Sequence, residues 1–423
     1  MVVKNLGEKR YIFHVDANSA YLSWEAVYRL QHGDPLDLRT VPSVVGGDPA
    51  TRHGIVLAKS IPAKKYQIQT GETVFNATMK CPHLVIVPPN YSLYRQCSDA
   101  MVEILREYSP LVQRFSVDEC FMDFSGMDLI LEDPVATAYT IKDRIKQELG
   151  FTVNVGVSTN KLLAKMASEL KKPDRVHTIF PTEIKQKMWP LPVEELFMVG
   201  RATAAKLRTR GIQTIGDLAN FDLQWLRQFL KSQGVLIWNY ANGIDYSPVR
   251  PSGSIEVKGM GNSTTIPFDV ENGQTASLVL LSLAESVSAR LRQAGILGRL
   301  VSVSFRTNEF YSCSHQRKVS NPTDCTEEIW KIACELFNEL WQGQPLRHMG
   351  LRVSELCQGD FIQTALFTKD YTKQRMADRA VDEIRAKYGI QAIHRSSFLH
   401  TRLRAVTGGV VENEEYPLMT SLL

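Results

Sequence analysis

The 423-residue chain lacks the features that would place it in a membrane or an oxidising compartment. No uninterrupted apolar run approaches the roughly 20 residues that span a bilayer, and Met1 to Glu8 contains no apolar signal core. The seven cysteines include no C-x-x-C pair, and Cys81-Pro82-His83, the nearest approach to a metal-binding pattern, is not a ligand framework. We therefore expect a soluble, cytoplasmic protein with reduced thiols.

A strong charge bias is also missing. The chain has 49 basic and 45 acidic residues, a formal net charge of +4. This balance allows a nucleic-acid partner without requiring one, because basic residues can gather in a single domain. Internal repeats and low-complexity blocks are absent as well, and the length is too great for one core, so we expect several ordinary globular domains.

The first part of the chain alternates strands with amphipathic helices as far as about Phe180. A strand, a helix, an acidic hairpin, a helix and a strand follow one another, which predicts a split β-α-β sheet of ferredoxin type. These five elements are expected at 11–16, 91–108, 116–121, 136–149 and 152–157, with further helices at 20–31 and 161–170 and short strands at 41–45, 54–59 and 83–87.

The pattern changes at Pro181. Residues 183–240 read as short helices separated by single glycines, and 242–253 is a turn-rich linker. A second α+β unit is expected over 255–357, followed by one helix at 374–388 and an acidic end. The elements expected in the second unit are a long helix at 276–293, a strand at 300–306, a helix at 327–340 and a strand at 349–356.

Two strand-like segments, 11–16 and 116–121, carry carboxylates at their ends. If the strand ending at Asp16 lies beside a hairpin turn at Asp118-Glu119, three carboxylates converge on one point. Like-charge repulsion makes such a cluster costly unless divalent cations neutralise it, and oxygen-only ligands favour Mg²⁺ or Mn²⁺ over zinc. Taken alone, Asp118-Glu119 also fits an ordinary solvated turn.

These two segments resemble motifs of the Y-family DNA polymerases, the translesion group, and most closely their UmuC-like and polymerase IV-like bacterial branches. The sequence HVDANSAY at 14–21 is similar to V-D-x-x-x-F/Y-Y, and SVDECFMD at 116–123 to S-x-D-E-x-F/Y-L-D. The resemblance runs from about Tyr11 to Phe367. It implies an α+β, multi-domain, right-hand polymerase with a ferredoxin-like palm (1–19 and 83–180), small fingers (20–82), a helix-hairpin-helix thumb (181–242), a linker (243–254), an α+β little finger (255–357) and a tail (358–423).

The resemblance implies a role for each residue of the first two motifs. Asp16 and Asp118 would bind both of two Mg²⁺ ions, for which Mn²⁺ could substitute, and the backbone carbonyl of Ala17 would add one oxygen. Glu119 would hold the catalytic ion. Tyr21 would lie under the sugar of the incoming nucleotide and collide with a ribose 2′-hydroxyl; on spacing alone, it also fits a core aromatic of a helix.

Two basic segments are similar to the parts of the family that bind the triphosphate. KSIPAKKY at 59–66 resembles S-Y-P-A-R-K and implies nucleotide contacts from Ser60 and Lys64. STNK at 158–161 with KKPD at 171–174 resembles S-x-N-K and K-P-D/N, with Lys172 as a second clamp. Ile61 replaces a common Tyr, and Lys64 an Arg with bidentate geometry. Either lysine alone also fits a solvated basic face.

Two further regions resemble the DNA-binding parts of the family. LFMVGRATAAKL at 196–207 is similar to the thumb helix-hairpin-helix, with Met198 where a glycine is usual. There, backbone N–H groups hold a DNA phosphate, with Gly200, Arg201 and Lys206 as the candidate residues here; a plain helix-turn core is the alternative. In the little-finger-like region the candidate backbone contacts are Arg299, Arg306, Arg317 and Lys318, which implies salt-dependent, sequence-independent binding.

The pentapeptide QTALF at 363–367 resembles the Q-x-x-L-F peptide by which bacterial polymerases dock on the sliding clamp. Gln363, Leu366 and Phe367 would bind the clamp, the two apolar side chains filling a pocket. Such a short peptide also occurs by chance.

The expected function is therefore a low-fidelity, template-directed DNA polymerase for lesion bypass in DNA repair and the SOS response, without a proofreading exonuclease. Its partners would be primer–template DNA, dNTP, the sliding clamp and, as in UmuC-type assemblies, an accessory subunit, on the nucleoid. A nucleotidyl cyclase shares a palm with two metal-binding carboxylates but does not explain 183–357. A non-catalytic DNA- or clamp-binding protein is supported by Ile61 and Met198 and opposed by the intact carboxylates.

Overall fold

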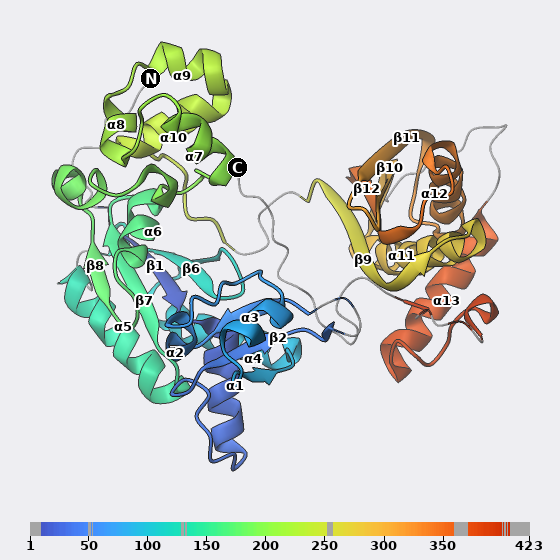
Figure 1. Ribbon diagram of the computed structural model, residues 1–423, viewed down its shortest axis with the longest axis horizontal. Helices are drawn as coiled ribbons and strands as arrows, with labels where there is room; N and C mark the ends of the chain where they lie inside the picture. The colour runs from blue at the N-terminus through green and yellow to red at the C-terminus, as the bar shows by residue number, and fades with distance from the viewer. Residues whose placement is uncertain are drawn as a thin grey trace. The chain divides into compact units, whose positions relative to one another are not determined.

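The computed structural model describes residues 10–49, 52, 54–127, 131, 133–251, 257–358, 371–399, 401, 403 and 405–406. The chain divides into two compact units (Figure 1). The first contains Met1–Val45, Val56–Gly71 and Ala77–Ile255, and the second contains Gly46–Ile55, Glu72–Asn76 and Glu256–Leu423.

A five-stranded sheet with the order β5-β6-β1-β7-β8 forms the centre of the first unit. Strand β1 (Ile12–Ala17) is buried throughout and pairs antiparallel with both neighbours, while β7 and β8 run parallel. The other strands are β5 (Leu111–Arg114), β6 (Glu119–Asp123), β7 (Val153–Ser158) and β8 (Val176–Thr178). The hairpin turn was expected at Asp118-Glu119. In the structure Asp118 lies in the turn, but Glu119 is already the first residue of β6.

Helices cover both faces of this sheet, and the strand period of two divides β1 between them. Phe13 and Val15 belong to the main core with residues of α4 (Tyr91–Tyr108) and α5 (Pro134–Leu149). Ile12 packs instead with Ala164 of α6 (Lys161–Glu169). Helix α5 begins sharply because Asp133 accepts hydrogen bonds from the N–H groups of Val135 and Ala136, with Pro134 in the first turn.

Two smaller groups of elements complete the first unit. A three-stranded sheet, β3-β2-β4, is accompanied by α1, α2 and α3. The helices α7 to α10 share a core with α6, the π turn η3 and the 3₁₀ turn η4, and the 3₁₀ turn η2 precedes η3 in the chain. Their bounds are β2 Ser43–Gly46, β3 Val56–Lys59, β4 Val85–Val87, α1 Ala20–Gln31, α2 Ile61–Lys64, α3 Val74–Lys80, η2 Pro181–Glu183, η3 Ile184–Met188, η4 Val193–Glu195, α7 Arg201–Arg208, α8 Ile215–Asn220, α9 Leu223–Leu230 and α10 Ser232–Ala241.

The second unit is built on an antiparallel sheet with the order β11-β10-β12-β9. One face packs against two helices, α11 and α12, visible beside the sheet in Figure 1. Strands β9 and β11 had not been predicted, because neither shows a regular alternation of apolar and polar residues. The bounds are β9 Gly259–Val270, α11 Gly273–Gln293, β10 Ile296–Thr307, β11 Ser312–Thr323, α12 Thr326–Leu340 and β12 Leu346–Gln358.

Helix α13 (Thr372–Tyr388) and the short turn η5 (Ser396–Phe398) extend this unit. Phe398 and Ala405 pack with Leu281 of α11, and arginine–carboxylate pairs tie α13 to α11 and to Asp324, which lies just before α12. Within the residues that the structure describes, every helix is too short or too polar to pass through a bilayer.

Candidate active site

Side chains of β1 alternate between the two faces of the sheet, and those of His14 and Asp16 lie on the face covered by α6. The first residue of β6 lies beside Asp16. Asp16 is paired in register with Glu119 of β6, and His14 lies opposite Gly156 of β7. A Cβ at Gly156 would come within 1.9 Å of the carbonyl oxygen of Ala164, so the missing side chain lets α6 lie directly against the sheet. The close approach brings the charged residues of α6 to the acidic strand ends.

Helix α6 presents charged residues at intervals of four. Lys165 Nζ lies 2.8 Å from Glu119 Oε2. One turn later, Glu169 Oε1 lies 2.9 Å from Lys172 Nζ, which also lies 2.9 Å from Asp16 Oδ1. Lys165 and Glu169 were not predicted from the sequence. Lys165 and Glu169 are four residues apart, and Glu169 and Lys172 are three apart, so all three lie on one side of the helix and its end, which is the sequence signal that groups them.

Oxygen atoms of Asp16, Glu119 and Glu169 all lie within 4.8 Å of one another, a donor set that suits a hard cation. Burial raises the pKa of Asp16 to about 8, and Glu119 and Glu169 add to the rise, while Lys172 opposes it. Burial would also raise the pKa of Glu119, but His14 and Lys165 hold that pKa below its usual range. The crowding of carboxylates therefore makes additional positive charge at Asp16 favourable.

His14 lies beneath this cluster and is fully buried. Burial lowers its pKa to about 4, so the ring is neutral at physiological pH. Nδ1 lies 2.7 Å from Ser168 Oγ, whose hydroxyl donates to the carbonyl of Lys165, so Nδ1–H is the donor. The ring orientation is thereby fixed, with Nε2 3.5 Å from Glu119 Oε2.

Asp118, expected beside Asp16 and Glu119, lies next to them in the turn before β6. Its carbonyl accepts a hydrogen bond from the N–H of Ala17 at 2.9 Å, and its carboxylate accepts one from the Ser116 hydroxyl at 2.6 Å. Burial raises the pKa of Asp118, and the charge of Glu119 adds to it. The three expected carboxylates therefore lie at adjoining strand ends, and the grouping within 4.8 Å contains Glu169 as its third member.

Tyr21 lies on α1, close enough to Asp118 for that carboxylate to affect it. Burial raises the pKa of Tyr21 to about 12, and Asp118 contributes to the rise. The ring stacks on Tyr94 with centroids 4.3 Å apart and meets Tyr91 edge-on at 6.2 Å. Tyr94 is itself held by a hydrogen bond to Glu25, so the ring of Tyr21 has a fixed orientation at the edge of the carboxylate cluster.

The other residues expected to contact a nucleotide differ in their surroundings. Lys64 is exposed at the end of α2. Ser60 is only 1% exposed and caps α2: its hydroxyl donates to the Val41 carbonyl and accepts from the N–H groups of Ser43 and Ala63. These contacts fill the hydrogen-bonding capacity of the Ser60 hydroxyl in this structure, and the expected nucleotide contact stays a prediction.

The expected DNA contacts of the first unit lie at the start of α7. Gly200 is the N-cap of this helix, and Arg201 and Lys206 are exposed on it. Met198, which occupies the usual glycine position, has φ +73°, so the chain makes the left-handed turn that glycine would make at lower cost.

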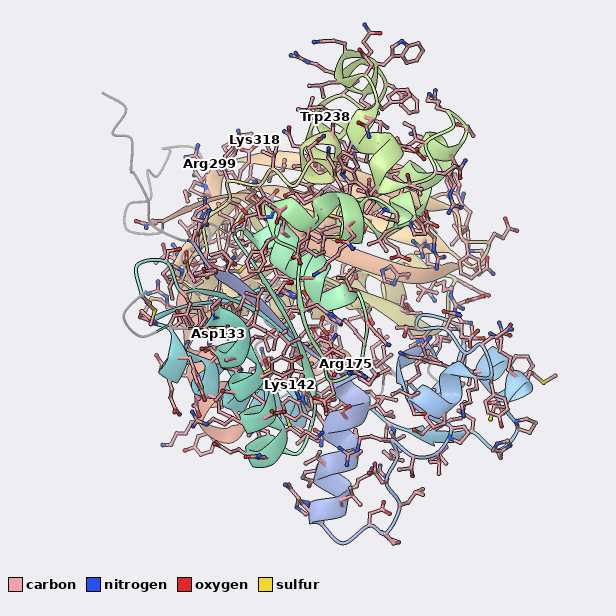
Figure 2. The ribbon with its side chains drawn as sticks, turned by 90° about the vertical axis from the view of Figure 1, so that its left-hand side faces the viewer. Asp133, Lys142, Arg175, Trp238, Arg299 and Lys318 are labelled. Carbon is pink, nitrogen blue, oxygen red and sulfur yellow. The ribbon has the colours of Figure 1, made fainter. Side chains whose placement is uncertain are left out.

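In the second unit, the four expected DNA contacts divide between the two faces of the sheet. Arg299, Arg306 and Lys318 are exposed, and Figure 2 labels the first and last of them. Arg317 is opposite the buried Val301, on the helix-covered face, where it pairs with Glu335 and Glu339 of α12. Arg317 is thus already paired with carboxylates of α12, and its expected DNA contact stays a prediction. Gln363, Leu366 and Phe367 lie outside the described residues.

The arrangement of strands and helices is that of a polymerase of the Y-family. A solved chimera of such polymerases, "Dbh-Dpo4(243-245)-Dbh", matches with a TM-score of 0.70 at 20% identity, covering 82% of this chain and 99% of its own. A Dbh ternary complex matches with a TM-score of 0.56 at 21% identity, over 81% of this chain and 98% of its own.

Sequence comparisons place the chain more closely. Residues 15–169 match the impB/mucB/samB family, 181–212 its HHH motif and 257–366 its C-terminal domain. DNA polymerase IV of Clostridium acetobutylicum is 47% identical over 92% of this chain and 98% of that relative, and DNA polymerase IV 2 of Bacillus subtilis is 36% identical over 93% and 95%. The chain belongs to this family, the Y-family polymerases.

Proposed function

We propose that the protein is a template-directed DNA polymerase that adds dNMP to a primer 3′-hydroxyl and copies across damaged bases. The observation that carries this proposal is that Asp16 of β1 lies opposite Glu119 of β6 while Lys172 forms an ion pair with Asp16. This chain aligns with nearly the whole length of relatives named DNA polymerase IV, which supports the same activity. A low-fidelity role in DNA repair and the SOS response follows from the family.

The carboxylate oxygens suit a hard cation such as Mg²⁺, and Asp16, Asp118, Glu119 and the carbonyl of Ala17 would hold a pair of such ions. When bound, such ions lower the pKa of the attacking hydroxyl and neutralise charge on the leaving pyrophosphate. The protein supplies position and electrostatics, and no protein nucleophile is required. Lys172 and Lys64 bind the phosphates, while Lys165 holds Glu119 in place.

Primer extension tests this function. We expect the parent to extend an undamaged primer–template with four dNTPs and Mg²⁺, and the Asp118→Ala, Glu119→Ala double variant to show none. The matched control, Asp143→Ala with Glu148→Ala, removes two exposed carboxylates of α5 and should extend like the parent. Absence of extension by the parent, with duplex binding intact, would favour an accessory protein or an obligate partner subunit.

Tyr21 supports selection of the sugar, because its ring is fixed beside the carboxylates. Replacing it with Ala should admit ribonucleotides, lowering the preference for dNTP over rNTP by roughly tenfold or more as the collision with the 2′-hydroxyl is lost. The ratio of kcat/KM for matched dNTP and rNTP measures this. Unchanged discrimination in a folded variant would refute the assignment.

The pentapeptide at 363–367 supports docking on the sliding clamp. Replacing Leu366 and Phe367 with Ala should leave basal extension intact and remove stimulation by the clamp, because the apolar anchor is lost. Equal stimulation of both forms would contradict clamp docking. A nucleoid-associated location, an accessory subunit and the absence of proofreading stay predictions.

A further inference from the structure

The loop that carries Lys172, between α6 and β8, is held by two buried side-chain amides. Asn154 of β7 is fully buried, and Asn18, two residues after Asp16, is 7% exposed. Asn18 Nδ2 donates to Asn154 Oδ1 at 3.1 Å, which joins the two amides. Neither residue was singled out by sequence, and neither is assigned a role by the function proposed above.

Asn154 ties the loop on both sides of Lys172. Its Nδ2 donates to the carbonyl of Ser168 at 2.9 Å and to that of Lys171 at 2.8 Å. Its Oδ1 accepts from the N–H of Arg175 at 3.3 Å, as well as from Asn18. All donor and acceptor positions of this amide are therefore in use.

Asn18 joins the same loop to the strand that carries Asp16. Its Oδ1 accepts from the N–H of Asp174 at 2.9 Å and from the hydroxyl of Thr152 at 3.0 Å. Asn18 follows Asp16 by two residues, and Asp174 follows Lys172 by two. The Asp174–Asn18 hydrogen bond therefore lies beside the Lys172–Asp16 ion pair as a second link between loop and strand.

The far side of the loop is anchored as well. The carboxylate of Asp174 lies 2.8 Å from both Lys142 and Lys146 of α5; Figure 2 labels Lys142 and the neighbouring loop residue Arg175. Asp174 has φ +58°, a conformation that an aspartate adopts without the cost it has for bulkier residues. The loop is thus fixed from α5, β7 and β1, with the ammonium group of Lys172 directed to Asp16.

We propose that Asn18 and Asn154 are positioning residues for nucleotide binding, which fix the Lys172 loop at the distance from Asp16 that the triphosphate requires. This inference rests on the proposed function. A long lysine side chain alone loses much rotamer freedom when it binds, so a loop held at both ends reduces the cost of placing its charge. The two amides act through Lys172 and touch no reacting atom.

Single-turnover primer extension at saturating Mg²⁺ and varied dNTP tests the proposal. We expect Asn18→Ala and Asn154→Ala each to raise the half-saturating dNTP concentration about tenfold, with the maximal rate within about threefold of the parent. In a Lys172→Ala background, Asn18→Ala should change that concentration by less than about twofold. The control Asn242→Ala removes an amide bonded to the carbonyls of Ala219 in α8 and Trp238 in α10 and should match the parent.

Three results would overturn the inference while leaving the proposed function intact. These are an unchanged half-saturating dNTP concentration in a folded variant that still extends, a fall in maximal rate alone, and a full tenfold effect that persists without Lys172. If both alanine variants fail to fold, Thr152→Val withdraws one donor from Asn18 and must still give a rise of about twofold. A parent that extends no primer would overturn both the function and the inference.

Discussion

The two units of the molecule each bury a cluster of charged side chains, and the clusters are built differently. In the first unit, Asp16 and Glu119 are neutralised by lysines, with a further carboxylate, Glu169, close by. In the second unit, the buried carboxylates Glu285, Asp324 and Asp378 all meet arginines.

The arginine pairs hold their carboxylates in fixed orientations. Arg375 meets both oxygens of Asp324, at 2.6 and 2.9 Å, and Arg292 meets both oxygens of Asp382, at 2.5 and 3.0 Å. Glu285 receives Arg385 at 2.6 Å and Arg395 on its other oxygen. A planar guanidinium holds a carboxylate in one orientation, whereas an ammonium group is a point charge that can exchange one partner for another.

The difference separates ion pairs that stabilise the fold from a cluster that can bind ligands. Arginine pairs hold α13 against the rest of the second unit. In the first unit the lysines can exchange a carboxylate for a phosphate, and the carboxylates can then bind cations. Carboxylate substitutions should accordingly cost activity in one unit and stability in the other.

The largest effect is expected from Asp16→Asn. Primer extension should fall by at least about 10³-fold, because the carboxylate that faces both Glu119 and Lys172 is lost. The thermal unfolding midpoint should not fall, since removing one of several clustered carboxylates relieves repulsion. A large loss of stability would show that Asp16 stabilises the fold as Glu285 does.

The pH dependence of stability sharpens the same point. A pKa of about 8 for folded Asp16, raised above its unfolded value, means that its stabilising contribution is present at low pH and is lost as the pH rises through about 8. In metal-free buffer, the unfolding midpoint of Asp16→Asn relative to the parent should therefore increase between about pH 5 and 8. A constant difference over that window would contradict the raised pKa.

The next largest effect is expected from Glu285→Gln in the second unit. It leaves the guanidinium of Arg385 buried without its carboxylate, at a cost of about 3 kcal/mol. Hydrogen exchange of the amides of α13 should accelerate by roughly 100-fold, with primer extension within about twofold of the parent. Glu383→Gln, an exposed residue of the same helix, is the control and should leave exchange unchanged.

The smallest effect is expected from Arg375→Lys, which keeps the charge and removes the two-point contact with Asp324. A loss of about 1 kcal/mol should appear as an approximately fivefold faster exchange at the start of α13. Arg379→Lys, exposed on the same helix, serves as the matched change. If both variants exchange equally, bidentate geometry is not what fixes the helix.

The sequence predicted the palm sheet and its carboxylates because buried strands with acidic ends, and helices with apolar stripes, are visible as periodic patterns. It missed Glu169 because a partly exposed glutamate on a helix looks like solvated surface until β1 and β6 come beneath it. It could not separate Arg317 from Lys318, because strand β11 has no apolar alternation to show which face the helices cover. It missed Asn18 and Asn154 because buried amides are identified by their partners, which are up to 156 positions apart.

Gly156 sets the distance between β7 and α6, which side-chain movements cannot adjust. The helix that carries Lys165 and Glu169 rests on the strand at this point, so the spacing between acidic and basic groups is fixed by backbone contact. Even one added methyl group would lift α6 from β7 and separate the charges as a rigid body. The geometry of this charged cluster is therefore set by how closely two segments of main chain can approach each other, and rotamer changes elsewhere would not restore it.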